Sequence, residues 1–495
     1  MNGPSIIHQN GKASKPIKVT HKDKREDVRA WKFGMMFIVC LTAVIFGLGS
    51  LRGWDAKSGH THNVSMTSRD RFLPEPFEEE FNITGRYGPD AHYRWHYWKL
   101  PPEKATALTR IVVWLCYVFH QIFVWMVIYE AQKMKMKTKE PKYSTEMAPF
   151  NWHALYINAG FHLLHLIQTQ VFYDALAQDV SVASSQGSVI MLLVLVLLLE
   201  YKDRGLAFGW PTEKSQGFFS QKLRLGSKPI DFIRKYHGYA FAWAAVYTFW
   251  YHPMENTWAH VSGFAYTWIL MLQGSLMYTR MHLNRYWRLF LEVWVVVHST
   301  TVAVQIAGPE LDGTKSWPMF LCGFLWLFAM TQIFSLSFWK KLPTFTRILP
   351  FAGYMCFNVW LFSWLPEAKG RAWVRMNEAV RIPTIQYLLA ILAWFAMEAF
   401  LRIQNRVWPK GNHPNSFALS RTACIVYSLL VYVGLIIISW LVQSQDILPC
   451  TNHSESHNHL HHRNMSGLCF LEPEFSSCEK KCRVIGLQEN TTIAI

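Results

Sequence analysis

Histidines recur at different depths in three consecutive apolar runs between Arg234 and Gln305. They are His237, His252, His260, His282 and His298. In hydrocarbon an ionisable group is costly, and it usually faces the bundle interior or a watery cavity. An imidazole can bind a transition metal, ligate haem iron axially or pass a proton. We therefore expect the functional site in this stretch.

Two of these histidines, His237 and His252, are fifteen residues apart on one predicted helix. At 1.5 Å per residue they are separated by ~22 Å along the axis, one near each membrane surface. Membrane cytochromes hold two haems with such an arrangement. The partners from other helices could be His282 at the inner side, and His260 or one of the mid-membrane histidines further out. Because the chain has no CxxCH motif, the cofactor would be haem b. Our candidate cofactor ligands are His237, His252 and His298. The alternative is that interfacial histidines such as His252 are simply tolerated.

A second group of histidines lies near mid-membrane. Asn158, His162, His165 and Thr169 are spaced by four, three and four residues, which places them on one helical stripe. His120 and His298, on two other predicted helices, fall at a similar depth. We therefore predict that His120, His162 and His165 are metal ligands, with His298 in the same layer. The alternative is that each histidine only bonds a carbonyl or hydroxyl across a helix interface.

Few carboxylates interrupt the apolar runs. Glu292 follows Arg288 by four residues, and Glu398 precedes Arg402 by four, so both are predicted to form local ion pairs. No deeply buried carboxylate of the kind that ion-coupled transporters use stands out. The chain contains no HExxH, no phosphate-binding loop, no GxGxxG after a strand and no GxSxG, so common soluble chemistries have no motif here.

The elements that must position these residues are long apolar helices. Half of the 495 residues (51%) are hydrophobic and only 17% are charged. The apolar residues gather in runs of about twenty, enough to cross a ~30 Å hydrocarbon layer. We predict an all-α polytopic transmembrane helix bundle of about eleven spans. The predicted spans are 31–51, 107–131, 151–175, 180–200, three within 234–305, 317–339, 348–365, 384–401 and 422–442.

The net charge of +16 comes mostly from basic residues in short loops and in the amino-terminal tail. The positive-inside bias explains these residues, and no nucleic-acid partner is needed. Residues 1–31 are predicted to be a disordered basic cytosolic tail, and 32–442 the bundle in the lipid bilayer. With an odd number of spans, the tail 443–495 is lumenal or extracellular. The basic loop 366–383 fits this topology least well, and an interfacial amphipathic helix would explain it.

Five Asn-x-Ser/Thr sequons lie on the predicted outer side, in the loop 52–106 and in the carboxyl-terminal tail. They are Asn63, Asn82, Asn452, Asn464 and Asn490. The same histidine-rich tail holds four cysteines, which favour two disulfides over a zinc site in an oxidising compartment. These features predict a glycoprotein of the secretory pathway or the plasma membrane, with a cytosolic amino terminus.

Three functional classes fit this pattern. The first is a membrane-embedded redox or metal-dependent enzyme whose histidines hold haem b or a transition metal. The second is a transporter or channel for an ion or small molecule, with a histidine-lined pathway. The third is a scaffold or receptor whose histidines are only packed. The scarcity of acidic residues within the spans favours the first class.

Overall fold

The computed structural model describes residues 25–54, 56, 105–137, 143–180, 182–213, 215–307, 316–364 and 376–407. Within these ranges the chain forms helices and no β-strands. The long helices are α1 (Glu26–Leu51), α3 (Ala107–Lys137), α4 (Pro149–Val171), α5 (Val182–Arg204), α7 (Ser227–Tyr251), α8 (Trp258–Ser275), α9 (Arg285–Ala307), α10 (Trp317–Met330), α11 (Leu349–Trp364) and α13 (Arg381–Val407). The short ones are η1 (Leu176–Gln178), α6 (Phe218–Leu223), η2 (Met281–Leu283), η3 (Gln332–Ser335), η4 (Ser337–Lys340), η5 (Thr344–Ile348) and η6 (Met376–Val380).

Six helical segments are long and apolar enough to cross a membrane. They are Glu26–Leu51, Ala107–Lys137, Ser184–Arg204, Arg285–Gln305, Trp317–Ser335 and Met376–Arg406. Some of them carry exposed apolar side chains, such as Phe119 of α3 and Phe395 of α13, which suits contact with lipid. The described residues thus confirm an all-α chain with apolar helices of membrane length, whereas the predicted number of about eleven spans is not confirmed.

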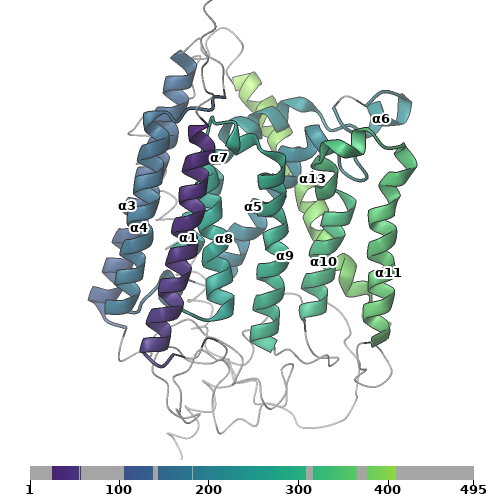
Figure 1. Ribbon diagram of the computed structural model, residues 1–495. Coiled ribbons are helices and arrows are strands. Elements are labelled where there is room, and N and C mark those ends of the chain that lie inside the picture. Colours follow the sequence, from purple (N-terminus) through teal and green to yellow (C-terminus); the bar gives the residue numbers. More distant parts are fainter. Residues whose placement is uncertain are drawn as a thin grey trace, which may run out of the picture.

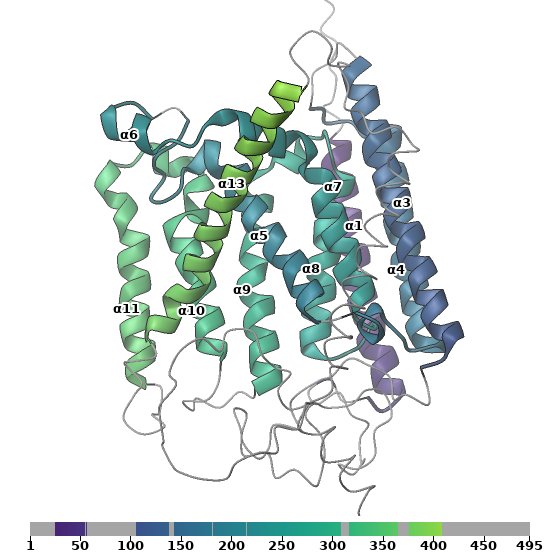
Figure 2. The ribbon, with the colours of Figure 1, turned by 180° about the vertical axis from the view of Figure 1, so that it is seen from behind.

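The long helices stand side by side, with α3 and α4 at one edge and α11 at the other (Figure 1). From behind, α13 crosses the bundle obliquely (Figure 2), and it packs against α5, α7 and α10. We call the end where α3 and α5 finish in Lys135, Lys137, Lys202 and Arg204 the basic end. The other is the opposite end. Helix α8 lies centrally, in contact with α1, α4, α7 and α9.

The largest apolar core joins α1, α3, α4, α7 and α8. Trp250, Trp268 and Tyr247 are fully buried in it. Burial of an aromatic side chain contributes ~1.5–3 kcal/mol through the apolar area removed from solvent. The candidate histidines of α3 and α4 lie among these aromatic rings, so the same packing that holds the helices together also fixes these histidines.

Most predicted helix positions agree with the structure to within a few residues. Helix α1 begins at Glu26, before the predicted boundary at residue 31, and α10 ends at Met330, where the short helices η3 and η4 take over. The predicted span 422–442, the sequons, the tail cysteines and most of the loop 366–383 lie outside the described residues. The described cysteines Cys40, Cys116, Cys322 and Cys356 are free thiols.

Candidate functional site: histidine pairs at the two ends of the α7–α8 hairpin

Two pairs of histidines lie near the two ends of the α7–α8 hairpin. At the opposite end, His252 follows α7 and its ring centre is 5.5 Å from that of His260 on α8. Nearer the basic end, the ring centre of His237 on α7 is 6.5 Å from that of His282 in η2. Both partners are those the sequence suggested. We call these the opposite-end pair (His252, His260) and the basic-end pair (His237, His282).

The Nδ1 atom of every histidine in the two pairs is held by an oxygen. Nδ1–H of His237 donates to the carbonyl of Arg234 (2.9 Å), and Nδ1–H of His252 to that of Thr248 (3.2 Å). Because a carbonyl oxygen can only accept, these bonds set the tautomer with the proton on Nδ1. Histidines that ligate metals almost always have their second ring nitrogen fixed in this way.

The partners across the hairpin are held by the same kind of contact. His282 Nδ1–H donates to the carbonyl of Gln273, near the end of α8 (2.9 Å). His260 Nδ1 lies 2.6 Å from the hydroxyl oxygen of Thr257, the residue that caps α8. All four rings are therefore oriented by α7, by α8 or by the turns that follow them.

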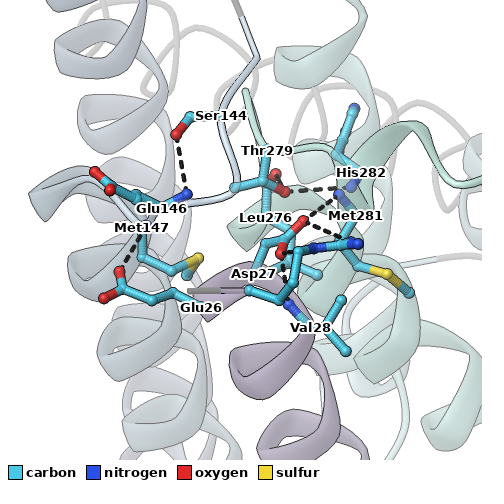
Figure 3. Close-up of polar contacts among 11 residues, drawn as sticks. Glu26, Asp27, Val28, Ser144, Glu146, Met147, Leu276, Thr279, Met281 and His282 are labelled. Atoms are coloured by element: carbon cyan, nitrogen blue, oxygen red, sulfur yellow. Dashed lines mark hydrogen bonds and ion pairs between the residues drawn. The ribbon is translucent and has the colours of Figure 1, made fainter. Parts of the chain in front are cut away.

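The turn that carries His282 is clamped by the amino-terminal end of α1. Figure 3 shows the buried carboxylate of Asp27 reaching the backbone N–H of Met281, which donates to it at 2.9 Å. The same carboxylate accepts from Arg25, and the Thr279 hydroxyl accepts from the backbone N–H of His282 (3.2 Å). The position of the basic-end pair thus depends on α1 as well as on α8.

The imidazole of His282 stays neutral. Burial lowers the pKa of His282 to about 4, and the nearby His237 and Arg288 act in the same direction. A neutral imidazole is the form that coordinates iron or another transition metal. Gln273 also links this site to α9, because the side-chain oxygen of Gln273 accepts a hydrogen bond from Trp287 Nε1 (2.7 Å).

The predicted mid-membrane stripe on α4 is buried as expected. Asn158, His162, His165 and Thr169 are each at most 6% exposed. His120 of α3 sits beside them in a complete hydrogen-bond chain. Trp250 Nε1 donates to His120 Nδ1 (3.1 Å), so the Nε2–H of His120 donates to the Asn158 side-chain oxygen (3.0 Å). Both ring nitrogens of His120 are therefore satisfied by protein groups.

The other two histidines of α4 lack such partners. Nε2 of His162 is 3.2 Å from the sulfur of Met271, a weak partner, and its Nδ1 is buried without a hydrogen bond. His165 is fully buried, and its ring nitrogens make no hydrogen bond of ordinary geometry, although the backbone of His252 lies close to its ring. Its ring stacks on Trp250 with centres 4.3 Å apart, and Phe249 meets it edge-on at 4.6 Å. His165 is also close enough to His120 and His252 to interact electrostatically.

His298 contributes to the opposite end of the bundle. Its Nδ1 lies 3.0 Å from the hydroxyl oxygen of Ser262, and its ring packs so closely on Gly263 that a Cβ there would be 2.8 Å from it. It interacts electrostatically with His252. Among the described residues, no group of three or more His, Cys, Asp or Glu side chains converges as a metal site. Metal binding by His120, His162 and His165 stays a prediction, as does cofactor binding by His237, His252 and His298.

The predicted local ion pair between Arg288 and Glu292 is wrong. Arg288 instead pairs with Glu200 of α5, and Glu292 accepts two hydrogen bonds of 2.8 Å from Arg204 Nη1. The local rule fails because α5 packs close enough to offer both side chains a partner in a buried setting. The predicted pair between Glu398 and Arg402 is confirmed at 3.0 Å.

Sequence reasoning did not single out Asp27, Thr257 or Gln273, which position the pairs. For Thr257 a signal existed, because a threonine three residues before His260 at a helix start is typical of a capping residue. Asp27 and Gln273 act across the fold and left no local pattern. Comparison of the chain with protein-family models, curated proteins and solved structures found no match.

Proposed function

We propose that this chain is an integral membrane redox protein that holds two haem b groups, one at each histidine pair. The observation that carries the proposal is the presence of two histidine pairs near the two ends of one hairpin, each ring anchored through Nδ1. His237 and His282 would ligate one haem, and His252 and His260 the other.

The number of ligands favours haem over a bare metal ion. A bare transition metal usually takes four protein ligands or keeps an open position beside three, whereas haem iron needs only two axial ligands from the protein. Two imidazoles on opposite sides of one haem iron, at metal–nitrogen bonds of ~2 Å, have ring centres roughly 6 Å apart. The observed separations of 6.5 and 5.5 Å lie on either side of this value.

When bound, haem supplies one-electron chemistry at each end. Along α7 the two pairs are ~22 Å apart, a large part of the ~30 Å hydrocarbon thickness. The protein's own contribution is to orient the rings, to keep His282 neutral and to surround the path between the pairs with buried aromatic side chains such as Trp250 and Trp268. This arrangement suits electron transfer across a bilayer.

The visible absorption spectrum of the purified, full-length protein tests this proposal. A Soret band that shifts on reduction with dithionite, with two haems per chain by pyridine haemochrome assay, is the expected result. Elemental analysis of the same sample separates haem iron from another metal. A colourless sample that takes up no added haem would overturn the proposal.

A second candidate function is an ion or proton transporter, and one observation favours it. His165 is a fully buried imidazole whose ring nitrogens make no hydrogen bond of ordinary geometry, near His120 and His252. A series of imidazoles through a membrane can pass a proton. Proton uptake by vesicles reconstituted with the protein, lost in His165→Leu and present without haem, would favour this function over the first.

A further inference from the structure

Two short segments at the basic end of the bundle expose aromatic side chains. In α6, Phe218 and Phe219 are 70% and 72% exposed, and in η5 Phe345 is 74% exposed. Figure 1 shows α6 and the connection from α10 to α11, which contains η5, at the end of the bundle and not along its length. A phenylalanine ring has no polar group, so contact with water is unfavourable for all three. An apolar surface from outside the described residues would stabilise them.

Lysines accompany the aromatic residues in both segments. Lys222 follows Phe218 by one helical turn, and its Nζ lies 5.7 Å from the centre of that ring. In the other segment, Lys340 and Lys341 are exposed and shortly precede Phe345. Both segments therefore offer ammonium groups and apolar rings on exposed positions close to one another.

The positive charge of the two segments is not balanced by neighbouring carboxylates. Neither 214–230 nor 331–350 contains an Asp or a Glu. The carboxylates of Glu213 and Asp231, which flank the first of these ranges, both pair with Lys202 of α5. The positive-inside bias accounts for basic residues at this end, but it does not account for exposed phenylalanines beside them.

Contacts between the two segments hold them as one surface. Nη1 of Arg347 in η5 lies 3.5 Å from the carbonyl oxygen of Gly209, in the loop that leads to α6. Trp210, the next residue, donates through Nε1 to the hydroxyl of Ser220 in α6 (2.7 Å). Both views place α6 beside the α10–α11 connection, at the edge of the bundle that α11 forms (Figures 1 and 2). We call the exposed residues of the two segments the anchor surface: Phe218, Phe219, Lys222, Lys340, Lys341 and Phe345.

We propose that the anchor surface binds anionic phospholipids, with the ammonium groups of its lysines on the head groups and its phenylalanine rings at the boundary with the acyl chains. Interfacial segments of proteins bind membranes through this combination of buried apolar side chains and attraction to anionic lipid. Each basic residue close to such a membrane surface strengthens the attraction. Neither part of the surface would be satisfied by a neutral lipid or by a free anion alone.

The location of the surface supports a bilayer as the partner. The segment Trp317–Ser335 is long and apolar enough to cross a membrane, and Lys340 and Lys341 follow its end by five and six residues. This distance places the two lysines near the head groups of the leaflet that the segment reaches. The positive-inside bias assigns the basic end to the cytosolic side, where anionic lipids give the membrane surface a negative potential.

Binding is tested with full-length protein in mixed detergent micelles that contain increasing amounts of phosphatidylserine, and native mass spectrometry counts the bound lipid. Saturable binding is expected, with an affinity at least about tenfold higher than for phosphatidylcholine of the same chain length. The triple variant Lys222→Gln/Lys340→Gln/Lys341→Gln should lower the affinity for phosphatidylserine at least about tenfold. All three lysines are exposed, and the thermal unfolding midpoint of the variant shows that it is folded.

The matched control removes the same charge from the same end of the bundle. Lys133→Gln/Lys135→Gln/Lys137→Gln alters the last turns of α3, at the far edge from α6 (Figure 1). This variant should bind phosphatidylserine with an affinity within about twofold of the unmodified protein.

The aromatic part of the surface is tested separately. Phe218→Ala/Phe345→Ala keeps every charge and should weaken phosphatidylserine binding severalfold, because less apolar area is buried against the lipid. The control Phe119→Ala/Phe395→Ala alters exposed rings on α3 and α13 and should leave the affinity unchanged. Glycerophosphoserine, the same head group without acyl chains, should not compete at equal concentration.

Four results would overturn the proposal. An equal loss of affinity in the two lysine variants would mean that net charge, and not this surface, attracts the lipid. Equal competition by glycerophosphoserine would assign the lysines to a free phosphate compound. Equal affinity for phosphatidylcholine would remove the recognition of charge, and binding of neither lipid would leave a soluble protein as the partner of the surface. The proposal does not rest on haem, since a haem-free protein should bind phosphatidylserine with the same affinity.

Discussion

The histidines of the α7–α8 hairpin and those at the middle of α4 differ in what holds their rings. In the opposite-end and basic-end pairs, Nδ1 is always fixed by a carbonyl or hydroxyl oxygen. On α4, His162 and His165 are packed by aromatic rings and their nitrogens are poorly partnered. Polar anchoring fixes the direction of a nitrogen, whereas aromatic packing fixes only the plane of the ring. The difference favours the hairpin histidines as cofactor ligands.

Removal of a ligand should produce the largest effect. His252→Ala is expected to abolish one of two haems, because it removes an axial ligand, and His237→Ala should abolish the other. His165→Leu should leave both haems in place. The haem-to-protein ratio and the reduced spectrum measure this, with His153→Ala on the exposed face of α4 as the control. Loss of haem in His165→Leu but not in His252→Ala would mean that the packed histidine of α4, and not the anchored histidine of the hairpin, is the ligand.

Removal of an anchor should have a smaller effect than removal of a ligand. Thr257→Val deletes the hydroxyl that lies 2.6 Å from His260 Nδ1 while keeping the side-chain shape. Loss of such an outer contact typically lowers metal affinity by ~10–100-fold. Titration of the haem-free protein with haem should show this loss at one of the two sites.

The control for the anchor is Thr301→Val, since the Thr301 hydroxyl bonds the carbonyl of Val297 in its own helix α9. It should bind haem as the unmodified protein does. An unchanged haem affinity in Thr257→Val would mean that packing alone orients His260. His260 would then not differ from the packed histidines of α4.

Stability offers a third way to separate anchored from packed histidines. His120→Leu would leave the side-chain oxygen of Asn158 and the indole N–H of Trp250 without their hydrogen-bond partner, so a loss of ~1–3 kcal/mol in the free energy of unfolding is expected. His165→Leu removes two nitrogens that make no hydrogen bond of ordinary geometry and should cost little or nothing. Denaturation in mixed detergent micelles measures both. A loss for His165→Leu as large as that for His120→Leu would show that His165 has a partner in the native membrane.

The comparison also shows where the sequence was informative. The helices and the depths of their histidines could be predicted because apolar runs of about twenty residues mark both directly. The pairing of His237 with His282 could be anticipated from depth alone. The anchors could not be predicted. Gln273 reaches His282 through the tight connection after α8, and Asp27 reaches the turn of His282 across 254 residues of sequence. Likewise, the i, i+4 rule paired Glu292 with Arg288, because a local rule carries no information about α5.

The smallest expected effect concerns the opposite end of α4, where the buried carboxyl of Asp174 accepts a 2.7 Å hydrogen bond from the backbone N–H of Ala175. Burial raises the pKa of Asp174 from 3.8 to about 6 and outweighs that bond and the charge of Arg110. As the pH rises from about 4 to 6, the unfolded chain loses this proton before the folded one does. Titration of Asp174 therefore lowers the free energy of unfolding as the pH rises from 4 to 6. Above the pKa of the folded state this contribution of Asp174 is constant.

Asp174→Asn should remove this pH dependence, because the amide resembles the protonated carboxyl and still accepts from Ala175. The thermal midpoint of Asp174→Asn, compared with that of the unmodified protein, should rise by about a degree or two between pH 4 and pH 7. A relative midpoint that falls over this range would mean that the Asp174 carboxylate is stabilised in the fold. The polar groups at this end of α4 would then be as well hydrogen-bonded as the histidines of the α7–α8 hairpin. Poorly hydrogen-bonded side chains of α4 would then be those of His162 and His165.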